Sequence, residues 1–424
     1  MLDIRRVRQE AEAIRGLLAK KGVDVDFAPL LERDARRRTL LTDMEQLKAE
    51  RNRVSEEVAR RKKAGQAADD LIKDMREVGE RIQGLEQEVR ALEESIQNEL
   101  LTIPNTPLSS VPSGTSEADN VEVRRWGIPP TFDFDPKAHW DLGETLGILD
   151  FERGRKLAGA RFTVFSGLGA QLSRALINFM LDHNRRRGYV EMATPYLVNR
   201  EALVGTGQFP KFEDDVFRVV PHEYYLIPTA EVTLTNLHRE EILSERELPI
   251  RYTGYTASFR AEAGAAGRDT RGIIRQHQFD KVELVQFVRP DDSSAALEVM
   301  VADAEDVLQT LGLPYRTVLL CGGDMGFSQA MTYDIEVWMP SYGRYVEISS
   351  CSNMGDFQAR RANIRYRPEG AKKTEFVHTL NGSALAIGRT FAAILENFQE
   401  PDGSVRIPEA LKPFFHGPAL IERS

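Results

Sequence analysis

Apolar positions in the first hundred residues follow a heptad rhythm. The cleaner of two series alternates by steps of four and three: Leu71, Met75, Val78, Ile82, Leu85, Val89, Leu92 and Ile96. An earlier series is less regular and has Arg51 in one slot: Leu40, Met44, Leu47, Val54 and Val58. This spacing is typical of the apolar seam of a coiled coil. The pattern therefore predicts two long helices.

A polar break at residues 63–69 separates the two series. We expect Gly65 to end the first helix and Asp69 to cap the second. Because the connection is so short, the helices should be antiparallel neighbours. Roughly 30 residues per helix, at a rise of about 1.5 Å each, give an arm about 45–50 Å long. We thus predict an arm at about residues 30–101, within an N-terminal domain of residues 1–110.

The pattern changes after residues 102–120, whose Pro, Ser, Thr and Gly content is typical of a linker. Short apolar runs rich in β-branched and aromatic residues follow at 224–228, 282–288, 333–340 and 345–349. Helical patterns fall at 170–187, 293–311 and 383–399. Strands and helices do not alternate in the rhythm of a parallel sheet. We therefore predict an α+β domain at residues 111–424, with a mainly antiparallel sheet flanked by helices.

The net charge of −9 argues against a general nucleic-acid binder. Any RNA contact must therefore come from a local basic face, and the first arm helix offers one. Residues 30–63 hold eleven Lys or Arg against seven Asp or Glu, whereas residues 69–101 hold four against ten. Pairing between the two helices explains much of this contrast. The basic clusters at 33–38, 51–53 and 60–63 exceed what pairing needs, and they could meet a phosphate backbone.

Composition also excludes several classes of protein. No run of 18 apolar residues suggests a membrane span, and the N-terminus lacks the apolar core of a secretory signal. Cys321 and Cys351 lie thirty positions apart with no Cys-x-x-Cys motif. They support neither a disulfide framework nor a zinc site. We expect two ordinary buried thiols in a cytoplasmic protein.

Candidate chemistry gathers around a glycine-rich segment at residues 265–272. No P-loop and no Gly-x-Gly-x-x-Gly motif is present, so any ATP phosphates must be held by side chains. Arg260 precedes the segment and Arg275 follows it, and guanidinium groups on strands can clamp phosphates. Phe279 could stack on a base, and Arg389 lies in a later helical pattern. Taken singly, each arginine could be a surface charge and Phe279 a core aromatic.

Five motifs together resemble the seryl-tRNA synthetase family over nearly the whole chain. GYVEMATPYLV at 188–198 resembles class II motif 1, residues 259–283 resemble motif 2, and residues 381–399 resemble motif 3. Thr229-Ala230-Glu231 is similar to the loop that recognises serine in that family, and residues 347–353 are similar to its E-[VI]-S-S-x-S-N strand. Ala261 and Ala384 depart from the usual Ser and Gly. We expect no loss of activity from either.

The resemblance implies a homodimeric class II serine–tRNA ligase. Such an enzyme forms seryl-adenylate from L-serine and ATP, then transfers serine to tRNA(Ser) and also to tRNA(Sec). The implied catalytic residues are Arg260, Glu262 and Arg389. The implied ATP-binding residues are Arg260, Ala261, Glu262, Arg275, Gln276, Phe279, Glu347, Ile348, Ser349, Ser350 and Arg389. The implied serine-binding residues are Thr229, Ala230, Glu231, Arg260, Glu283, Asn381 and Ser383. Glu347 and Ser350 would hold Mg²⁺ with ATP, and neither zinc nor a membrane is expected.

Two other functions stay open at this point. A ligase that loads a carrier protein would lack the long arm, so the heptads count against it. A non-catalytic RNA-binding paralogue should have lost one of Arg260, Glu262, Glu347 and Arg389, and all four are present. In the family, the arm grips the long variable arm of tRNA and serves the active site of the other subunit. We also expect residues 263–272 to become ordered when ATP or tRNA binds.

Overall fold

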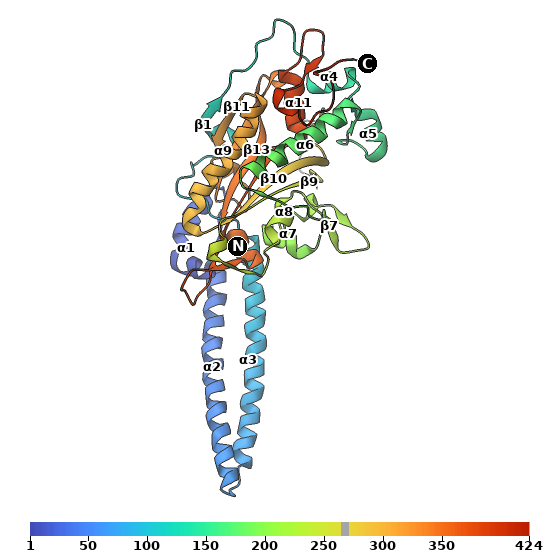
Figure 1. The fold of residues 1–424 in the computed structure, drawn as a ribbon. Coiled ribbons are helices and arrows are strands. Elements are labelled where there is room, and N and C mark those ends of the chain that lie inside the picture. The colour runs from blue at the N-terminus through green and yellow to red at the C-terminus, as the bar shows by residue number, and fades with distance from the viewer. Residues whose placement is uncertain (264–270, 424) are drawn as a thin grey trace. The chain divides into compact units, whose positions relative to one another are not determined.

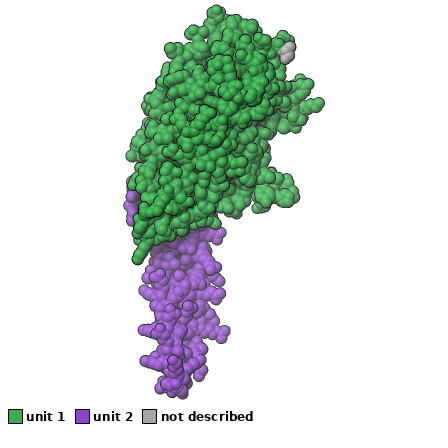
Figure 2. Space-filling view, viewed as in Figure 1, with its two compact units in different colours: residues 1, 17–23, 105–424 green, residues 2–16, 24–104 purple. Residues whose placement is uncertain are grey.

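The computed structural model describes residues 1–263 and 271–423, which form two compact units. One unit holds residues 2–16 and 24–104. The other holds residue 1, residues 17–23 and residues 105–424 (Figure 2). The chain therefore passes between the units at several points rather than once. The division at residue 110 into a tRNA-binding and a catalytic domain stays a prediction.

The first unit is built on two long helices, α2 (Ala28–Lys63) and α3 (Asp69–Thr102), which pack side by side (Figure 1). The heptad prediction is confirmed, because Leu40, Ile82, Val89 and Ile96 are buried between them. Gly65 adopts the left-handed conformation (φ +69°) just after α2 ends. That backbone is open to glycine without a steric penalty. The helix α1 (Ile4–Ala19) precedes the pair.

The predicted cap of the second arm helix was wrong. Ala68 is the N-cap of α3 and makes no side-chain cap bond, while Asp69 is already the first helical residue. The carboxylate of Asp69 therefore acts on the positive end of the helix dipole rather than as a cap. Pairing between the arm helices is confirmed, since Arg36 binds Glu88 at 2.5 Å and Lys48 binds Glu86 at 2.7 Å.

The second unit contains an eight-stranded sheet with the order β1-β11-β12-β13-β16-β10-β9-β4. Neighbours are antiparallel apart from β4 and β9, which run parallel. The predicted α+β fold is confirmed. The strands of this sheet, in chain order, are β1 (Val121–Trp126), β4 (Val190–Glu191), β9 (Ile250–Phe259), β10 (Gln278–Val288), β11 (Tyr315–Leu319), β12 (Met331–Met339), β13 (Arg344–Gly355) and β16 (His378–Ala386).

One face of the sheet is covered by three helices and carries the main core. These helices are α6 (Leu168–Arg186), α9 (Ser293–Leu311) and α11 (Ile387–Asn397). Val282 and Leu284 of β10 point into this core, whereas Val285 and Phe287 belong to a smaller apolar cluster. Side chains alternate between faces along a strand. Residues 279, 281 and 283 therefore share the face opposite the three helices.

The remaining elements surround this framework. The short helices are α4 (His139–Thr145), α5 (Phe151–Ala158), α7 (Arg200–Thr206), α8 (Glu231–Asn236) and α10 (Phe357–Ala362). Smaller sheets use β2 (Leu149–Asp150), β3 (Val164–Phe165), β5 (Leu197–Val198), β6 (Arg218–Val219), β7 (Tyr224–Leu226), β8 (Ile242–Ser244), β14 (Arg365–Arg367), β15 (Glu375–Phe376), β17 (Val405–Arg406) and β18 (Leu420–Ile421). Short 3-10 turns occupy 117–119, 213–215, 245–247, 290–292, 322–324, 340–342 and 409–411.

Two expectations about chain segments need correction. The helix expected at 383–399 begins only at Ile387, because residues 378–386 pair with β10 and β13 as strand β16. The stretch 102–120 has the composition of a linker, yet residues 103–107 are buried. Both cysteines are free and buried, as expected. Within the described ranges, the helices lack the combined length and apolar composition that a bilayer span requires.

Candidate active site

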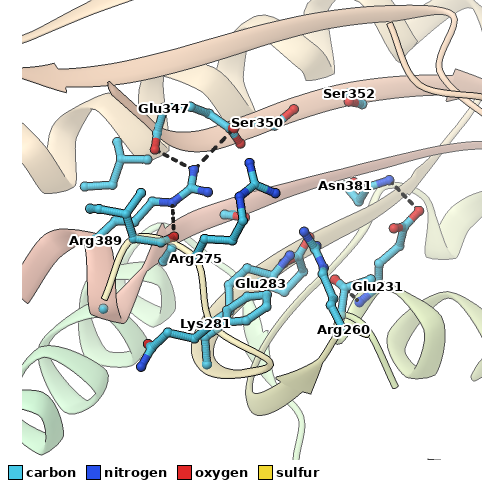
Figure 3. A pocket seen from close by; sticks show the side chains of 18 of the residues that line it. Glu231, Arg260, Arg275, Lys281, Glu283, Glu347, Ser350, Ser352, Asn381 and Arg389 are labelled. Carbon is cyan, nitrogen blue, oxygen red and sulfur yellow. Dashed lines mark hydrogen bonds and ion pairs between the residues drawn. The ribbon is translucent and has the colours of Figure 1, made fainter. Parts of the chain in front are cut away.

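A cavity of about 300 Å³ lies over the sheet and is also bordered by the start of α11, which supplies Arg389 (Figure 3). Strands β10, β13 and β16 form its floor, so residues far apart in sequence meet there. It is lined by most of the predicted site residues: Thr229, Glu231, Arg260, Glu262, Arg275, Gln276, Phe279, Glu283, Glu347, Ile348, Ser350, Asn381, Ser383 and Arg389. Three predicted residues lie outside this lining: Ala230, Ala261 and Ser349.

A β-bulge explains the position of Ser349. The pairing of β12 with β13 shifts by one residue between Ile335 and Glu336, so Glu347 and Ser350 both reach the cavity. A bulge turns the following side chains to the other face of the strand. Ser349 is consequently buried, and its hydroxyl donates to the carbonyl of Ser383 at 2.6 Å.

Three alanines singled out in the sequence contribute to the surrounding fold and not to the cavity lining. Ala230 is fully buried in the smaller apolar cluster and fixes the start of α8, which presents its neighbours Thr229 and Glu231. The amide of Ala261 donates to the carbonyl of Asp215 at 3.0 Å. Ala384 is fully buried in the main core. Both departures from the usual family residues therefore lie outside the cavity lining.

Arg260 and Arg275 stand on either side of the segment that the sequence singled out. The Nε of Arg260 donates to the carbonyl of Pro228 at 3.3 Å, and its guanidinium lies 5.0 Å from the ring centre of Phe279. Burial lowers the pKa of Arg260, but an arginine keeps its charge at neutral pH. Arg275 binds Glu262 at 2.7 Å. Residues 264–270 lie outside the described residues, and so does most of the predicted ordering of this segment.

Glu262 adopts a backbone conformation that non-glycine residues rarely use. Its φ is +54°, in the left-handed region. Such a conformation costs of order 1–3 kcal/mol and persists where surrounding contacts fix it. The contact with Arg275 is one such restraint. In this conformation Glu262 lines the cavity.

Arg389 organises the other end of the cavity. Its Nη1 donates to the Glu347 carbonyl at 2.6 Å and lies 3.2 Å from the Glu347 carboxylate, while its Nε donates to the carbonyl of Ile274 at 3.3 Å (Figure 3). The charge of Arg389 lowers the pKa of Glu347 despite burial. Glu347 is therefore ionised at neutral pH.

Glu231 lies in a different electrostatic setting. It accepts hydrogen bonds from the amides of Gln358 at 2.6 Å and Asn381 at 2.9 Å, both of which are neutral donors. Burial, and then the charge of Glu283, raise the pKa of Glu231 to about 7. Glu283 is itself paired with Lys281 at 2.6 Å. In the described part of the chain, Glu231 has no cation at ion-pair distance.

Sequence reasoning missed several lining residues. Lys281 is the most telling, because it lies two positions from both Phe279 and Glu283 and strand alternation puts all three on one face. Gln329, Ser352, Met354 and Gly388 also line the cavity. Gln329 belongs to a loop without a recognisable motif, so no signal in the sequence pointed to it.

A second cavity, of about 570 Å³, continues from the first. It shares Thr229, Glu231 and Arg260 with its neighbour and extends over the aromatic side chains of Phe212 and Phe327. These two rings form an edge-to-face pair at 6.2 Å. The first cavity is thus open toward a larger, partly aromatic space.

The oxygen groups beside Arg389 fit a hard cation such as Mg²⁺. Glu347 and Ser350 face the cavity, and Asp334 is paired with Ser350 across β12 and β13. The Oδ1 of Asp334 is buried without a hydrogen-bond partner among the described residues. Burial, and then the charge of Glu347, raise the pKa of Asp334 well above its usual value. Mg²⁺ prefers oxygen ligands and usually completes its shell with phosphates and water. Among the described residues, no group of three or more His, Cys, Asp or Glu side chains could hold a metal ion.

Comparison with known proteins shows which family has this combination of domains. Residues 1–107 match the model of the seryl-tRNA synthetase N-terminal domain, and residues 212–398 match that of the class II tRNA synthetase core domain (G, H, P, S and T). A serine–tRNA ligase of Thermodesulfovibrio yellowstonii is 58% identical over 417 residues, covering 98% of each chain. The chain belongs to the seryl-tRNA synthetase family.

Solved structures agree with the family assignment. The seryl-tRNA synthetase of Pyrococcus horikoshii, in complex with ATP, superimposes with a TM-score of 0.93 at 40% identity and covers 100% of both chains. The cytoplasmic serine–tRNA ligase of Naegleria fowleri, in complex with AMP, gives a TM-score of 0.89 at 30% identity over 100% of this chain and 99% of that one. The resemblance drawn from five motifs is confirmed.

Proposed function

We infer that the chain is a serine–tRNA ligase that activates L-serine with ATP and then transfers it to tRNA. Membership of the family supports this function, and the cavity supports it independently. The observation that carries it is the charge pattern of that cavity, where three arginines surround a space that also holds a buried carboxylate, Glu231. ATP is a polyanion, and serine carries an ammonium group, so both substrates find opposite charge.

In the first step, an oxygen of the serine carboxylate attacks the α-phosphorus of ATP. A phosphorus–oxygen bond to the carboxylate forms, and the bond to pyrophosphate breaks. The carboxylate is already ionised, so no general base is required and catalysis rests on positioning and charge stabilisation. We assign Arg260, Glu262 and Arg389 to this task. Removing one such charge-stabilising donor costs about 10²–10³ in rate.

The nucleotide would lie along strands β10 and β13. We assign Phe279 to the adenine and Arg275 with Gln276 to the phosphates. Glu347, Ile348 and Ser350 border the same space. Glu347 and Ser350 would hold Mg²⁺ with ATP. When bound, this ion spreads the negative charge on the phosphates. The low pKa of Glu347 keeps its carboxylate ready for that role.

Serine would lie deeper, beside α8. We assign Glu231 to its ammonium group, because Glu283 already has a cationic partner in Lys281. Thr229, Asn381 and Ser383 supply the polar groups that a hydroxyl needs. A site built for a hydroxyl rejects alanine strongly, since its own polar groups would then be unpaired. Threonine would be excluded by the size of the pocket.

In the second step, the 3′-terminal ribose hydroxyl of tRNA attacks the carbonyl carbon of seryl-adenylate, and AMP leaves. We propose that the arm holds the tRNA through basic groups that the arm itself does not neutralise. Arg51, Lys62 and Lys63 make no ion pair within the described residues and are exposed. Arg36, by contrast, forms an ion pair with Glu88.

Further parts of the proposal concern assembly and setting. We propose that the enzyme is a cytoplasmic homodimer, in which the arm of one subunit presents tRNA to the active site of the other. We also propose that tRNA(Sec) is a substrate beside tRNA(Ser). Residues 1–110 would serve tRNA binding, and residues 111–424 would serve catalysis.

The test is aminoacylation of unfractionated bacterial tRNA, with ATP and Mg²⁺, across twenty labelled amino acids. It compares the full chain with the triple variant Arg51→Ala, Lys62→Ala, Lys63→Ala and the control Arg36→Ala. Charging with serine alone, weakened in the triple variant only, supports the proposal. Serine-dependent pyrophosphate exchange without tRNA charging would favour a carrier-loading ligase. Silence in both assays would favour a non-catalytic paralogue.

A further inference from the structure

A loop at residues 326–330, here called the wall loop, forms one side of the second cavity. Gly326, Phe327, Ser328 and Gln329 line that cavity, and Gln329 also lines the first. The wall loop lies just before β12 and belongs to neither a helix nor a strand. Its carbonyl groups therefore have no ladder partners and must be satisfied from elsewhere.

Every carbonyl of the wall loop accepts a hydrogen bond from one of three distant residues. The ammonium of Lys21 donates to the carbonyls of residues 326, 327 and 329 at 2.8, 3.5 and 2.6 Å. The backbone N–H of Asn105 donates to the carbonyl of residue 327 at 2.9 Å, and its side-chain amide donates to the carbonyl of residue 328 at 2.9 Å. The amide of Leu108 donates to residue 330 at 2.8 Å.

These three residues occupy special positions along the chain. Lys21 lies in residues 17–23, between the two stretches of the arm unit, and Asn105 is the first residue after that unit ends. Leu108 follows three residues later. The segments that lead into and out of the arm thus carry the donors that shape the wall loop. The side chain of Asn105 also donates to the carbonyl of Met354, another lining residue, at 2.8 Å.

Burying a lysine ammonium costs free energy unless its N–H groups donate hydrogen bonds. Burial, and then the charge of Lys211, lower the pKa of Lys21 to about 7. An ammonium offers three donors, and the three carbonyls of the wall loop match that number. A surface lysine would not need this arrangement. The neighbouring Lys20 donates to the carbonyls of Ser109 and Val111, which line neither cavity.

We propose that Lys21 and Asn105 are positioning residues for the transfer of serine to tRNA. They hold the wall loop, and through it Phe327 and Gln329, in the shape that the terminal adenosine of tRNA meets in the second cavity. The inference rests on the proposed function. It goes beyond that function because it links the segments that lead into and out of the arm to one step of the reaction rather than to tRNA affinity alone.

The two reaction steps should respond differently to loss of Lys21. The wall loop supplies four lining residues to the second cavity but only Gln329 to the first. Adenylate formation uses the first cavity, so it should change little. Transfer needs the ribose hydroxyl within reacting distance, and a misplacement of about 1 Å can cost about 10²-fold. We therefore expect a loss of transfer without an equal loss of activation.

The test uses the full chain with Lys21→Met, which keeps the apolar stem of the side chain, and Lys20→Met as the matched control. Single-turnover transfer from preformed seryl-adenylate to transcribed tRNA(Ser) is compared with serine-dependent pyrophosphate exchange. For Lys21→Met we expect transfer to fall about 10- to 100-fold. For Lys21→Met, pyrophosphate exchange and the KM for tRNA should stay near those of the unmodified chain. The control Lys20→Met should keep the melting temperature of the unmodified chain.

Several results would overturn the inference. One is transfer by Lys21→Met at the unmodified rate, and another is an equal fall of both steps together with the melting temperature. An equal loss in Lys20→Met would also overturn it. If Lys21→Met does not fold, Asn105→Ala serves as the second variant. It removes the side-chain bonds to the carbonyls of residues 328 and 354, and transfer should fall more than pyrophosphate exchange. The unmodified chain is assayed first, so a failure to charge tRNA with serine would be assigned to the proposed function and not to Lys21.

Discussion

Serine binding should weaken as the pH falls below 7, because Glu231 would gain a proton. This carboxyl is buried and lies near the charge of Glu283, and these two causes raise its pKa to about 7. A raised carboxyl pKa means that the ionised form is present above about pH 7 and is lost below it. The serine ammonium stays charged throughout this range. Protonation of Glu231 therefore removes its only proposed anionic partner.

The size of the effect follows from the pKa. At pH 8 about nine-tenths of Glu231 is ionised, and at pH 6 about one-tenth is ionised. If only the ionised form binds serine, KM for serine should rise about tenfold from pH 8 to pH 6, which corresponds to about 1.4 kcal/mol. The variant Glu231→Gln keeps acceptors for Gln358 and Asn381 but has no charge to lose. It should bind serine weakly at every pH.

The assay is serine-dependent pyrophosphate exchange between pH 6 and pH 8.5, with KM for serine and KM for ATP measured at each point. The KM for ATP is the internal control, because the phosphates are expected at arginines whose charge does not change here. A change in KM for serine of less than twofold across this range would refute the reasoning. So would a pH dependence in Glu231→Gln equal to that of the unmodified chain.

Three further predictions concern Arg389, the exposed basic groups of the arm, and the stability cost of burying Glu231. Replacing Arg389 by Met should slow pyrophosphate exchange about 10²–10³-fold at saturating serine, and stopped-flow pyrophosphate release would show an unchanged rate if Arg389 only braces the fold. The triple variant Arg51→Ala, Lys62→Ala, Lys63→Ala should leave pyrophosphate exchange intact and lower the slope of log Kd for tRNA against log salt by about 2; filter binding at several salt concentrations measures this, and an unchanged slope contradicts it. The variant Glu231→Gln should raise the free energy of unfolding at pH 8 by up to about 3 kcal/mol and by little at pH 5, because burying an ionised Glu231 costs stability only above its unfolded pKa; urea melts at both pH values would exclude this if the gain were equal.

Local periodicity made the arm and one strand of the site predictable. Ile82, Val89 and Ile96 follow the seam of a coiled coil, and that pattern needs no knowledge of distant residues. Alternation along β10 places Phe279 and Glu283 on one face, and it also would have identified Lys281. Patterns of these kinds depend only on residues that are close together in the sequence.

Features that depend on long-range pairing were not predictable in this way. The shift between β12 and β13 turns Ser349 away from the cavity, and it depends on which residues of two strands face each other. The start of α11 at Ile387 depends on the pairing of β16 with its neighbours. The contact between Lys21 and the wall loop joins residues about 300 positions apart. Composition alone made residues 103–107 look like a linker, although the wall loop holds Asn105 in place.

The two carboxylates of the cavity explain why a pH change can separate the substrates. Arg389 lowers the pKa of Glu347, whereas burial and Glu283 raise that of Glu231. Environments that push two carboxyl groups apart in this way give them different roles in one site. Glu347 and the arginines beside it keep their charge from pH 6 to pH 8, whereas Glu231 on the serine side loses its charge over this range. A rise in KM for serine at constant KM for ATP would therefore be the signature of this arrangement, and a parallel rise in both would indicate general unfolding of the site instead.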